Sequence, residues 1–284
     1  MSIEIESLSY TYMEDTPLSH TALHDVTLTL REGAFTAIAG ETGAGKSTLM
    51  QLIGGLLTPT AGQVRVDGVS LYGKSRAEKD AARTARFRVG MVFQYPEHQL
   101  FEETVYEDIA FGPRNQGLTD AETETRVREA MELVHLPEGY RDRSPFALSG
   151  GERRRVAIAG VLALAPRYLV LDEPAAGLDP RGREELLSML TMLHRERGVS
   201  IVLVSHSMED ILRVADYMVI LAGGQVIGEG APQELFRQDE LLARAALAAP
   251  HLMQLGQQLD AAGYPVADCM TVEEMAAEIL ESSR

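Results

Sequence analysis

The sequence of 284 residues predicts an α/β fold, in which helices cover a mainly parallel sheet. Short apolar runs such as "RYLVLDEP" and "SIVLVSH" are typical of buried strands, and a helix-like segment, "GREELLSMLTMLHRERG", separates these two runs. Before residue 40, short segments instead alternate polar and apolar residues, which is typical of half-buried strands. The chain is therefore expected to begin in β-structure and to continue as strand, helix, strand units.

A helical insertion is predicted at about residues 96–164, where no strand pattern occurs. Thr119 and Glu122 have the spacing of a capping box. Behind that cap, three apolar residues fall on one helical face: Val127, Met131 and Val134. After a Gly and Pro break near residue 230, an Ala- and Leu-rich pattern follows. We therefore expect one domain at 1–230, which contains the insertion, and a small helical C-terminal extension at 231–284.

The charge of the chain limits the partners that it is expected to bind. The formal net charge is −16, whereas nucleic acids and anionic bilayers are bound through clustered Lys and Arg, so nucleic acid is not an expected partner. The arginines at 153–155 are instead expected to pair with local carboxylates. The most apolar stretch, "VAIAGVLALAP", spans about ten residues, while crossing a bilayer takes roughly 18 to 20. Any membrane role is therefore expected to come through a partner.

Three residues and the start of the chain are expected to have no special role. The first residues, "MSIEIESLSYTY", lack the pattern of a signal peptide, so no export is expected. Cys269 is the only cysteine, which excludes an intrachain disulfide and a cysteine zinc site, and we expect it to be inert. His20 and His24 have helical spacing, but strands flank them and no acid supports a metal site, so they are expected to be surface residues.

One segment, "GETGAGKST", fits the spacing of a phosphate-binding loop, with a strand pattern before it and a helical pattern after it. Its glycines let backbone N–H groups point at phosphates, and the following helix adds about half a positive charge at its N-terminus. Lys46 is expected to reach the outer phosphates and Ser47 to bind Mg²⁺. The residues expected to bind the nucleotide here are Gly40, Glu41, Thr42, Gly43, Ala44, Gly45, Lys46, Ser47 and Thr48.

Polar residues also follow three other predicted strands, at the sheet edge where open α/β sheets bind ligands. Asp172 and Glu173 come directly after four apolar residues, and burying such a pair is costly unless a cation meets it. We expect Asp172 to hold Mg²⁺ and Glu173 to orient or deprotonate the attacking water. We expect His206 to contact the γ-phosphate and Gln94 to coordinate the metal or its water.

The order of the motifs, with "LSGGE" after the phosphate loop and then "LVLDEP", "GLDP" and "SH", resembles the ATP-binding cassette (ABC) family over about residues 1–230. The resemblance implies a P-loop NTPase (RecA-like) core with an N-terminal antiparallel β-subdomain, and ATP and Mg²⁺ as cofactors. In that family two cassettes pack head to tail, and the signature residues of one chain contact the γ-phosphate held by the other. Those signature residues would here be Ser149, Gly150 and Gly151.

The same resemblance implies roles for four further residues. Tyr12, rather than Tyr10, would stack on adenine, and Gln94 would sense the membrane partner. Asp179 would bridge the dimer interface, and His206 would be the switch histidine.

Two positions depart from the family pattern. Glu152 stands where Gln is frequent, and Ala175 stands where Thr or Ser is common. Neither departure removes a phosphate or metal ligand, so ATPase activity is expected to survive both.

A closer resemblance, to the ATPase subunits of energy-coupling factor transporters, comes from "FQYPEHQLFEETVYEDIAFGP" and "DRSPFALSGGERRRVAIAGVLAL". The variants "ETGAGKST" and "EHQLFEETV" are most similar to the second of the two paired ATPases. The implied partners are a second ATPase subunit, in a homo- or heterodimer, a transmembrane coupling subunit, and a small membrane protein that captures a vitamin or a transition metal ion. Such a chain would lie at the cytoplasmic face of the cell membrane, and its C-terminal extension would help it to dimerise.

Five acids follow Gln94, in the segment that borders the groove for the coupling helix in such cassettes. They are Glu97, Glu102, Glu103, Glu107 and Asp108. We expect some of them to receive an arginine from that helix, because a charge-assisted bidentate pair transmits motion with fixed geometry. The alternative interpretation is a merely solvated acidic face.

Two other functions are weighed against the transport ATPase. A soluble ABC ATPase of DNA repair or translation would need a coiled-coil insertion, a second cassette or a basic surface, and the sequence shows none of these. A non-catalytic, nucleotide-gated scaffold predicts degeneration at Glu173, His206 or the signature, and all of these are intact. The sequence therefore favours an ATP-hydrolysing subunit that powers import.

Overall fold

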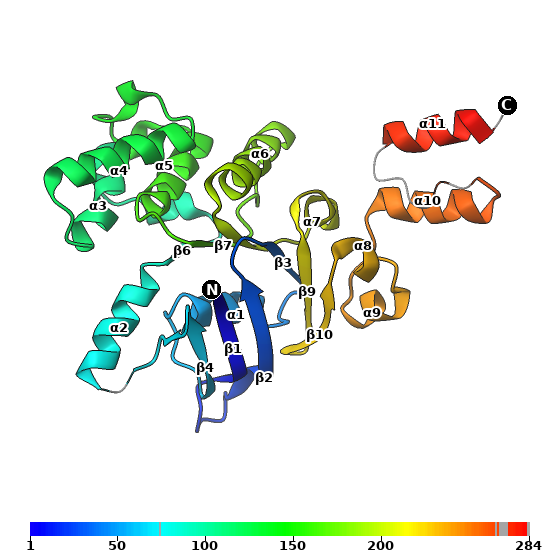
Figure 1. Cartoon of the computed structure of the whole chain (residues 1–284), viewed down its shortest axis with the longest axis horizontal. Helices are drawn as coiled ribbons and strands as arrows, with labels where there is room; N and C mark the ends of the chain where they lie inside the picture. Colours follow the sequence, from blue (N-terminus) through cyan, green and yellow to red (C-terminus); the bar gives the residue numbers. More distant parts are fainter. Residues whose placement is uncertain (74, 265, 267–271, 283–284) are drawn as a thin grey trace.

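The computed structural model describes residues 1–73, 75–264, 266 and 272–282, and two sheets form its body (Figure 1). The first sheet is antiparallel and contains the first two N-terminal strands, which confirms the predicted β-subdomain, whereas the third, Phe35–Ala39, is buried in the second sheet. Its strands run in the order β2-β1-β4-β5. They are β1 (Ser2–Tyr12), β2 (His20–Arg31), β4 (Ala61–Val66) and β5 (Val69–Ser70).

The second sheet carries the strands that precede the predicted catalytic loops. Its order is β10-β9-β3-β8-β7-β6, and all neighbouring pairs are parallel except β9 with β10. The strands are β3 (Phe35–Ala39), β6 (Val89–Val92), β7 (Tyr168–Asp172), β8 (Ser200–Val204), β9 (Tyr217–Ala222) and β10 (Gln225–Gly230). The carboxyl ends of the parallel strands therefore lie at one edge, and the predicted strand, helix, strand unit is confirmed.

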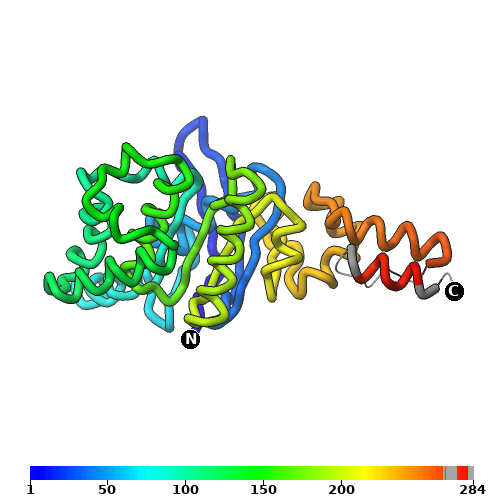
Figure 2. The backbone as a smooth tube through the Cα atoms, turned by 90° about the horizontal axis from the view of Figure 1, so that it is seen from above, coloured from blue at the N-terminus to red at the C-terminus, as the bar shows by residue number. Residues whose placement is uncertain are grey.

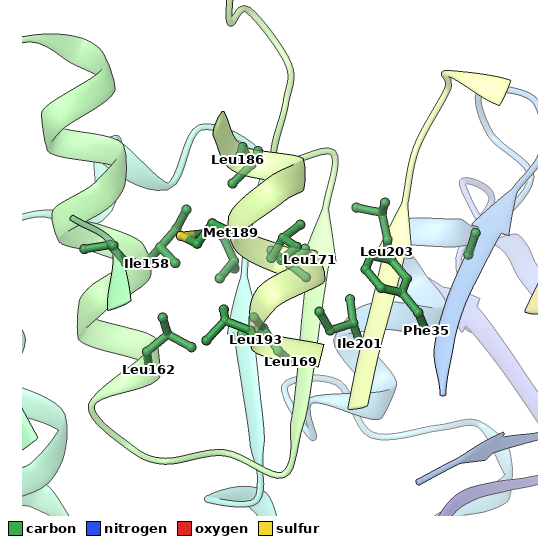
Figure 3. Packing of buried hydrophobic residues seen from close by; sticks show 14 of the residues in the cluster. Phe35, Ile158, Leu162, Leu169, Leu171, Leu186, Met189, Leu193, Ile201 and Leu203 are labelled. Atoms are coloured by element: carbon green, nitrogen blue, oxygen red, sulfur yellow. The ribbon is translucent and has the colours of Figure 1, made fainter. Parts of the chain in front are cut away.

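Side chains of the six-stranded sheet enter two cores, one on each face. On β7, Leu169 and Leu171 pack into one core, and Tyr168 and Val170 pack into the other. The helices that cover the two faces include α1 (Lys46–Ile53), α5 (Gly150–Leu162) and α6 (Pro180–Arg197). Figure 3 shows the first core, where α5 and α6 meet over β7 and β8. Because both faces are covered, β7 and β8 are largely apolar rather than alternating.

The segment between β6 and β7 is helical and contains no strand, as predicted. Its first two α-helices, which precede α5, are α3 (Val105–Asn115) and α4 (Asp120–Leu133). Thr119 and Glu122 form the predicted capping box of α4, and Val127, Met131 and Val134 are buried behind it.

One helix, α2 (Arg76–Arg86), is not among the predicted elements. It begins with a capping box of Ser75 and Glu78, a signal that the sequence contains.

The chain is helical again after β10, and Figure 2 shows its last two helices extending from one end of the body. In the described residues the helices after β10 are α8 (Pro232–Leu235), α9 (Asp239–Arg244), α10 (His251–Ala261) and α11 (Val272–Ser282), of which α10 and α11 extend from the body. Phe236 is buried in the first core, whereas Val266 and Met275 form a small cluster of their own. Among the described residues no helix is long and apolar enough to cross a membrane. Cys269 lies outside the described residues.

A buried carboxylate joins the two sheets at the amino-terminal end of β7. The side chain of Asp67, 4% exposed, accepts a hydrogen bond of 2.9 Å from Arg88 and one of 2.8 Å from the hydroxyl of Tyr168. Asp67 lies in the turn between β4 and β5. This ion pair fixes the antiparallel sheet against the parallel one, at the end of the strands opposite to the predicted site.

Substitution Thr119→Ala is expected to lower the free energy of unfolding by about 1 kcal/mol, because α4 loses its N-terminal cap. Urea unfolding followed by circular dichroism would measure the change. The matched control is Thr125→Ala in the exposed middle of α4, which should alter the free energy of unfolding less. Equal losses for the two variants would contradict a capping role for Thr119.

Candidate active site

Four loops meet at the carboxyl edge of the parallel strands and border a cavity of about 400 Å³. The loops that follow β3, β6, β7 and β8 bring Lys46, Gln94, Glu173 and His206 to its wall. The antiparallel sheet supplies the opposite side, through the ends of β1 and β2. The lining residues are Tyr12, His20, Ala22, Thr42, Gly43, Gly45, Lys46, Ser47, Thr48, Gln94, Glu173 and His206.

The loop between β3 and α1 has the backbone shape that its glycines predict. Gly43 and Gly45 have φ angles of 86° and 98°, in the left-handed region that favours glycine. A Cβ at Gly45 would also lie 2.6 Å from the carbonyl oxygen of Ala22, so a side chain is excluded there. Because α1 begins at Lys46, its N-terminus lies at the cavity, where backbone N–H groups and the helix dipole favour an anion.

Lys46 is buried, and its ammonium group donates hydrogen bonds of 2.7 Å to the carbonyl oxygens of Gly40 and Glu41. Burial lowers the pKa of Lys46 from its ordinary value, while the negative charges of Glu173, Asp172 and Glu41 oppose that shift. Carboxylates therefore outnumber the ammonium group at this edge of the sheet. This excess of negative charge favours the binding of a cation at the same edge when phosphates are also bound there.

Glu173 and His206 are in direct contact, with His206 Nε2 2.5 Å from Glu173 Oε1. Glu173 has a φ of 48°, which is strained for a side chain of its size. Its N–H donates to the carbonyl of Val204, and its own carbonyl accepts from the N–H of Ala176, both at 3.1 Å. The backbone thus holds the carboxylate at the cavity, where its side chain is 22% exposed and can meet water.

The residues predicted to hold Mg²⁺ are all oxygen donors. Ser47 and Gln94 line the cavity, whereas Asp172, at the end of β7, is not among the lining residues. Hydroxyl, amide and carboxylate oxygens are the ligands that Mg²⁺ accepts, together with phosphate oxygens, so this set fits the ion. Among the described residues no group of three or more His, Cys, Asp or Glu could hold a metal.

The antiparallel sheet contributes one predicted residue and one that sequence reasoning missed. Tyr12 lines the cavity and Tyr10 does not, although the two rings pack edge to face with their centroids 4.7 Å apart. The Tyr12 hydroxyl lies 3.1 Å from Thr48 Oγ1. His20 and His24 are exposed, as expected, but His20 also lines the cavity because it pairs with Tyr12 across β1 and β2. An alternating pattern predicts a strand without showing which end meets the phosphate loop.

The signature residues lie outside this cavity. Ser149 caps α5: its hydroxyl accepts from the N–H of Glu152, whose carboxylate in turn accepts from the N–H and hydroxyl of Ser149 at 2.8 Å. These hydrogen bonds lower the pKa of Glu152 to about 2. Gly150 and Gly151 are exposed, and a Cβ at either would meet no atom within 4 Å. Packing inside this chain therefore does not explain why glycine stands at both positions.

Asp179, predicted to bridge a dimer interface, acts in this chain as the N-cap of α6. Its carboxylate accepts a hydrogen bond of 2.6 Å from the N–H of Gly182. The residue is exposed, so one carboxylate oxygen can also meet a group outside the chain.

The acids after Gln94 do not form one uniform face. Glu97 pairs with Arg154 and Glu107 with Arg114, while the carboxylate of Asp108 accepts backbone N–H groups from Phe101 and Glu102. In the part of the chain that the structure describes, Glu102 and Glu103 have no ion pair, and Glu103 is exposed.

The arginines at 153–155 pair with carboxylates in part, as predicted. Arg154 binds Glu97, and Arg155 lies 3.5 Å from Glu185. The Nε of Arg153 has no hydrogen-bond partner among the described residues.

Comparisons with known proteins show the family of the chain. The ABC transporter family model matches residues 23–176. The energy-coupling factor transporter ATP-binding protein EcfA2 of Clostridium perfringens is 45% identical, with 100% of this chain and 99% of that protein covered. The protein of the same name from Geobacillus kaustophilus is 47% identical over 98% of this chain and 96% of its own.

Two solved structures are similar as well. One is cbiO1 from Clostridium perfringens, part of the ABC transporter complex cbiONQ, with a TM-score of 0.74 and 34% identity over 91% of this chain and 98% of its own. The dimeric bacterial ABC transporter cassette MJ0796 has a TM-score of 0.70 and 30% identity over 81% of this chain and 98% of its own.

These relatives are transporter ATP-binding proteins, so they do not support a role in DNA repair or translation or as a non-catalytic scaffold. The P-loop NTPase core and the use of ATP are confirmed. The chain belongs to the ABC transporter family, among its energy-coupling factor transporter ATP-binding proteins, and couples ATP hydrolysis to transport.

Proposed function

We propose that this chain powers the uptake of a vitamin or a transition metal ion, as a peripheral subunit at the cytoplasmic face of the cell membrane. The observation that carries the proposal is the cavity itself, in which a phosphate loop faces Glu173 and His206. The names of the relatives support the energy-coupling factor assignment. Its partners would be a second ATPase subunit, a transmembrane coupling subunit and a small substrate-capturing membrane protein. Copurification of the full chain from its native membranes, with identification of the associated subunits, tests this assembly.

In the proposed reaction the residues at the cavity have separate roles in binding the nucleotide, holding the metal and activating water. Lys46 and the N–H groups of the phosphate loop would hold the phosphates, and Tyr12 would stack on the base. Ser47, Gln94 and Asp172 would hold Mg²⁺, which would offset negative charge that develops on the transferred phosphoryl group. Glu173 would accept a proton from the attacking water.

The proposed role of His206 follows from its contact with Glu173. Its Nε2 bonds the carboxylate of Glu173, and its ring lines the cavity. We propose that it keeps that carboxylate directed at the water and contacts the γ-phosphate.

Hydrolysis is proposed to need two chains. Ser149, Gly150 and Gly151 would contact the γ-phosphate in the partner's cavity, with Asp179 bridging the interface. The open space around both glycines supports this, because it leaves room for a phosphate to approach the N-terminus of α5. The domain at 1–230 would form this contact, and the extension at 231–284, whose last two helices project from the body in Figure 2, would help the chains to dimerise.

Two of the acids after Gln94, which form no ion pair with any described residue, are proposed to receive the membrane subunit. Glu97, Glu107 and Asp108 bond within the chain, which leaves Glu102 and Glu103 to pair with an arginine of a coupling helix.

Substitution Glu173→Gln is expected to slow hydrolysis at least about 10²-fold, or about 2.7 kcal/mol of barrier, because the amide cannot accept the proton. ATP binding should persist, since the phosphate loop is unchanged. Steady-state phosphate release and equilibrium ATP binding would measure the two properties. Near-normal turnover would remove Glu173 from the catalytic role.

Substitution Ser149→Arg is expected to abolish hydrolysis while ATP still binds to the isolated chain, because the bulky cation would block the site only when two chains meet. Calorimetric titration of ATP into the monomer, beside an ATPase assay of the assembly, separates these effects. Loss of ATP binding by the monomer would contradict the proposed action across the interface.

The double variant Glu102→Gln, Glu103→Gln is expected to lose copurification with the membrane subunits while ATP binding remains. The matched control is Glu129→Gln, Glu132→Gln, which removes the same two charges from exposed positions of α4 and should assemble normally. Intact assembly and transport in the first variant would leave the acidic segment as a merely solvated face.

A further inference from the structure

The most completely bonded arginine near the cavity belongs to α5 and lies outside the phosphate site. Arg154 is 5% exposed, and four of its N–H groups are used. Its Nε and Nη2 donate to the two carboxylate oxygens of Glu97 at 3.0 and 2.9 Å. Its Nη1 donates to the carbonyl oxygens of Pro174 and Ala176 at 2.9 and 3.0 Å. One planar side chain thus binds a carboxylate on one edge and two backbone carbonyls on another.

The partners of Arg154 come from the two segments that adjoin predicted catalytic residues. Glu97 follows Gln94 by three positions, in a short turn of 3₁₀ helix (Pro96–Gln99). Pro174 and Ala176 belong to the loop that begins at Glu173. Arg154 itself lies one helical turn beyond Gly150 and Gly151. Three segments that are distant in sequence are therefore joined through one guanidinium group.

The bond between Arg154 and Glu97 is a buried, charged pair. The Glu97 side chain is 12% exposed and that of Arg154 6%. Burial by itself would raise the pKa of Glu97, but the hydrogen bonds and the charge of Arg154 outweigh it and hold that pKa below its usual value. A bidentate pair of this kind is directional, because both oxygens and both nitrogens must lie in one plane. A shift of the Glu97 turn would therefore move Arg154, and with it the loop after Glu173.

We infer that Arg154 is a positioning residue for ATP hydrolysis, which holds the loop after Glu173 in register with the Glu97 turn and with the signature end of α5. Its two bonds to Pro174 and Ala176 fix the loop on which the strained backbone of Glu173 depends. Its bond to Glu97 links that loop to the segment after Gln94. The inference rests on the proposed role of Glu173 and adds a group that touches neither nucleotide nor metal.

Substitution Arg154→Met keeps the volume of the side chain and removes all four hydrogen bonds. In the full chain, coexpressed with its membrane partners, kcat is expected to fall about 10- to 100-fold, because a misplaced catalytic group costs rate even when bonding at the nucleotide is intact. ATP affinity should not change, since none of the bonds of Arg154 reaches the phosphate loop. Arg154→Lys should remain impaired, because one ammonium group cannot span a carboxylate and two carbonyls.

Glu97→Gln is the more conservative variant, and it tests the positioning role of Arg154 even if Arg154→Met does not fold. It keeps the shape of the side chain and removes only the charge, so kcat should fall while ATP affinity is retained, and thermal stability should fall less than in Arg154→Met. Added to Arg154→Met, it should cause no further loss of kcat, because the two residues would act as one unit. Unchanged kcat in Glu97→Gln would overturn the inference.

Arg88→Met is the matched control for a purely structural loss. Arg88 also pairs with a buried acid, Asp67, but at the opposite end of the strands. It should lower thermal stability and leave kcat unchanged. If Arg154→Met lowers stability and ATP affinity with no separate fall in kcat, Arg154 is only structural and the inference is wrong. Parallel assay of Glu173→Gln keeps the two ideas apart: normal turnover there would remove the proposed base, whereas the response to Arg154→Met tests the positioning residue.

Discussion

The parallel register of β3, β8, β7 and β6 is the constraint on which the whole site depends. Ile38 pairs with Val204, and Asp172 pairs with that same residue, so the strands end level with one another. The register is fixed because β7 is buried on both faces: a slip of one residue would exchange Leu169 and Leu171 with Tyr168 and Val170 between the two cores. Apolar packing far from the cavity thus sets the positions of the polar groups within it.

Polar groups at that edge are held by backbone as much as by one another. Lys46 is bonded to the carbonyls of its own loop, and Glu173 is held in a left-handed conformation by the carbonyl of Val204 and the N–H of Ala176. Such a conformation costs about 1 to 3 kcal/mol and persists only where its surroundings over-determine it. The bonds from Arg154 to the next loop residues are part of those surroundings. The conformation of the loop after β7 is therefore fixed by backbone bonds at Glu173 and by the bonds of Arg154 to Pro174 and Ala176.

Features set by local spacing could be predicted from the sequence, whereas contacts between distant segments could not. The phosphate loop, the buried strands and the cap at Thr119 follow from residues a few positions apart, and all three are observed. His20 lines the cavity only because the antiparallel sheet packs against the parallel one, and that packing joins segments distant in sequence. The sequence places Glu97 among five acids after Gln94, yet its side chain is only 12% exposed and binds Arg154, 57 positions away. The capping box of Ser75 and Glu78 is likewise a local signal, which indicates that α2 could be predicted from the sequence.

The charges at the cavity support the proposal that one chain forms only half of a working site. Lys46 is the only Lys or Arg among the described residues that line the cavity, and it already faces Glu173 and Asp172. A triphosphate would add several negative charges, which one ammonium group, one helix N-terminus and a divalent ion offset only in part. The exposed N-terminus of α5 in a second chain carries about half a positive charge and has open space at Gly150 and Gly151. Closure of two such chains would therefore be favoured by nucleotide itself, and removal of the γ-phosphate charge would weaken the contact that holds them together.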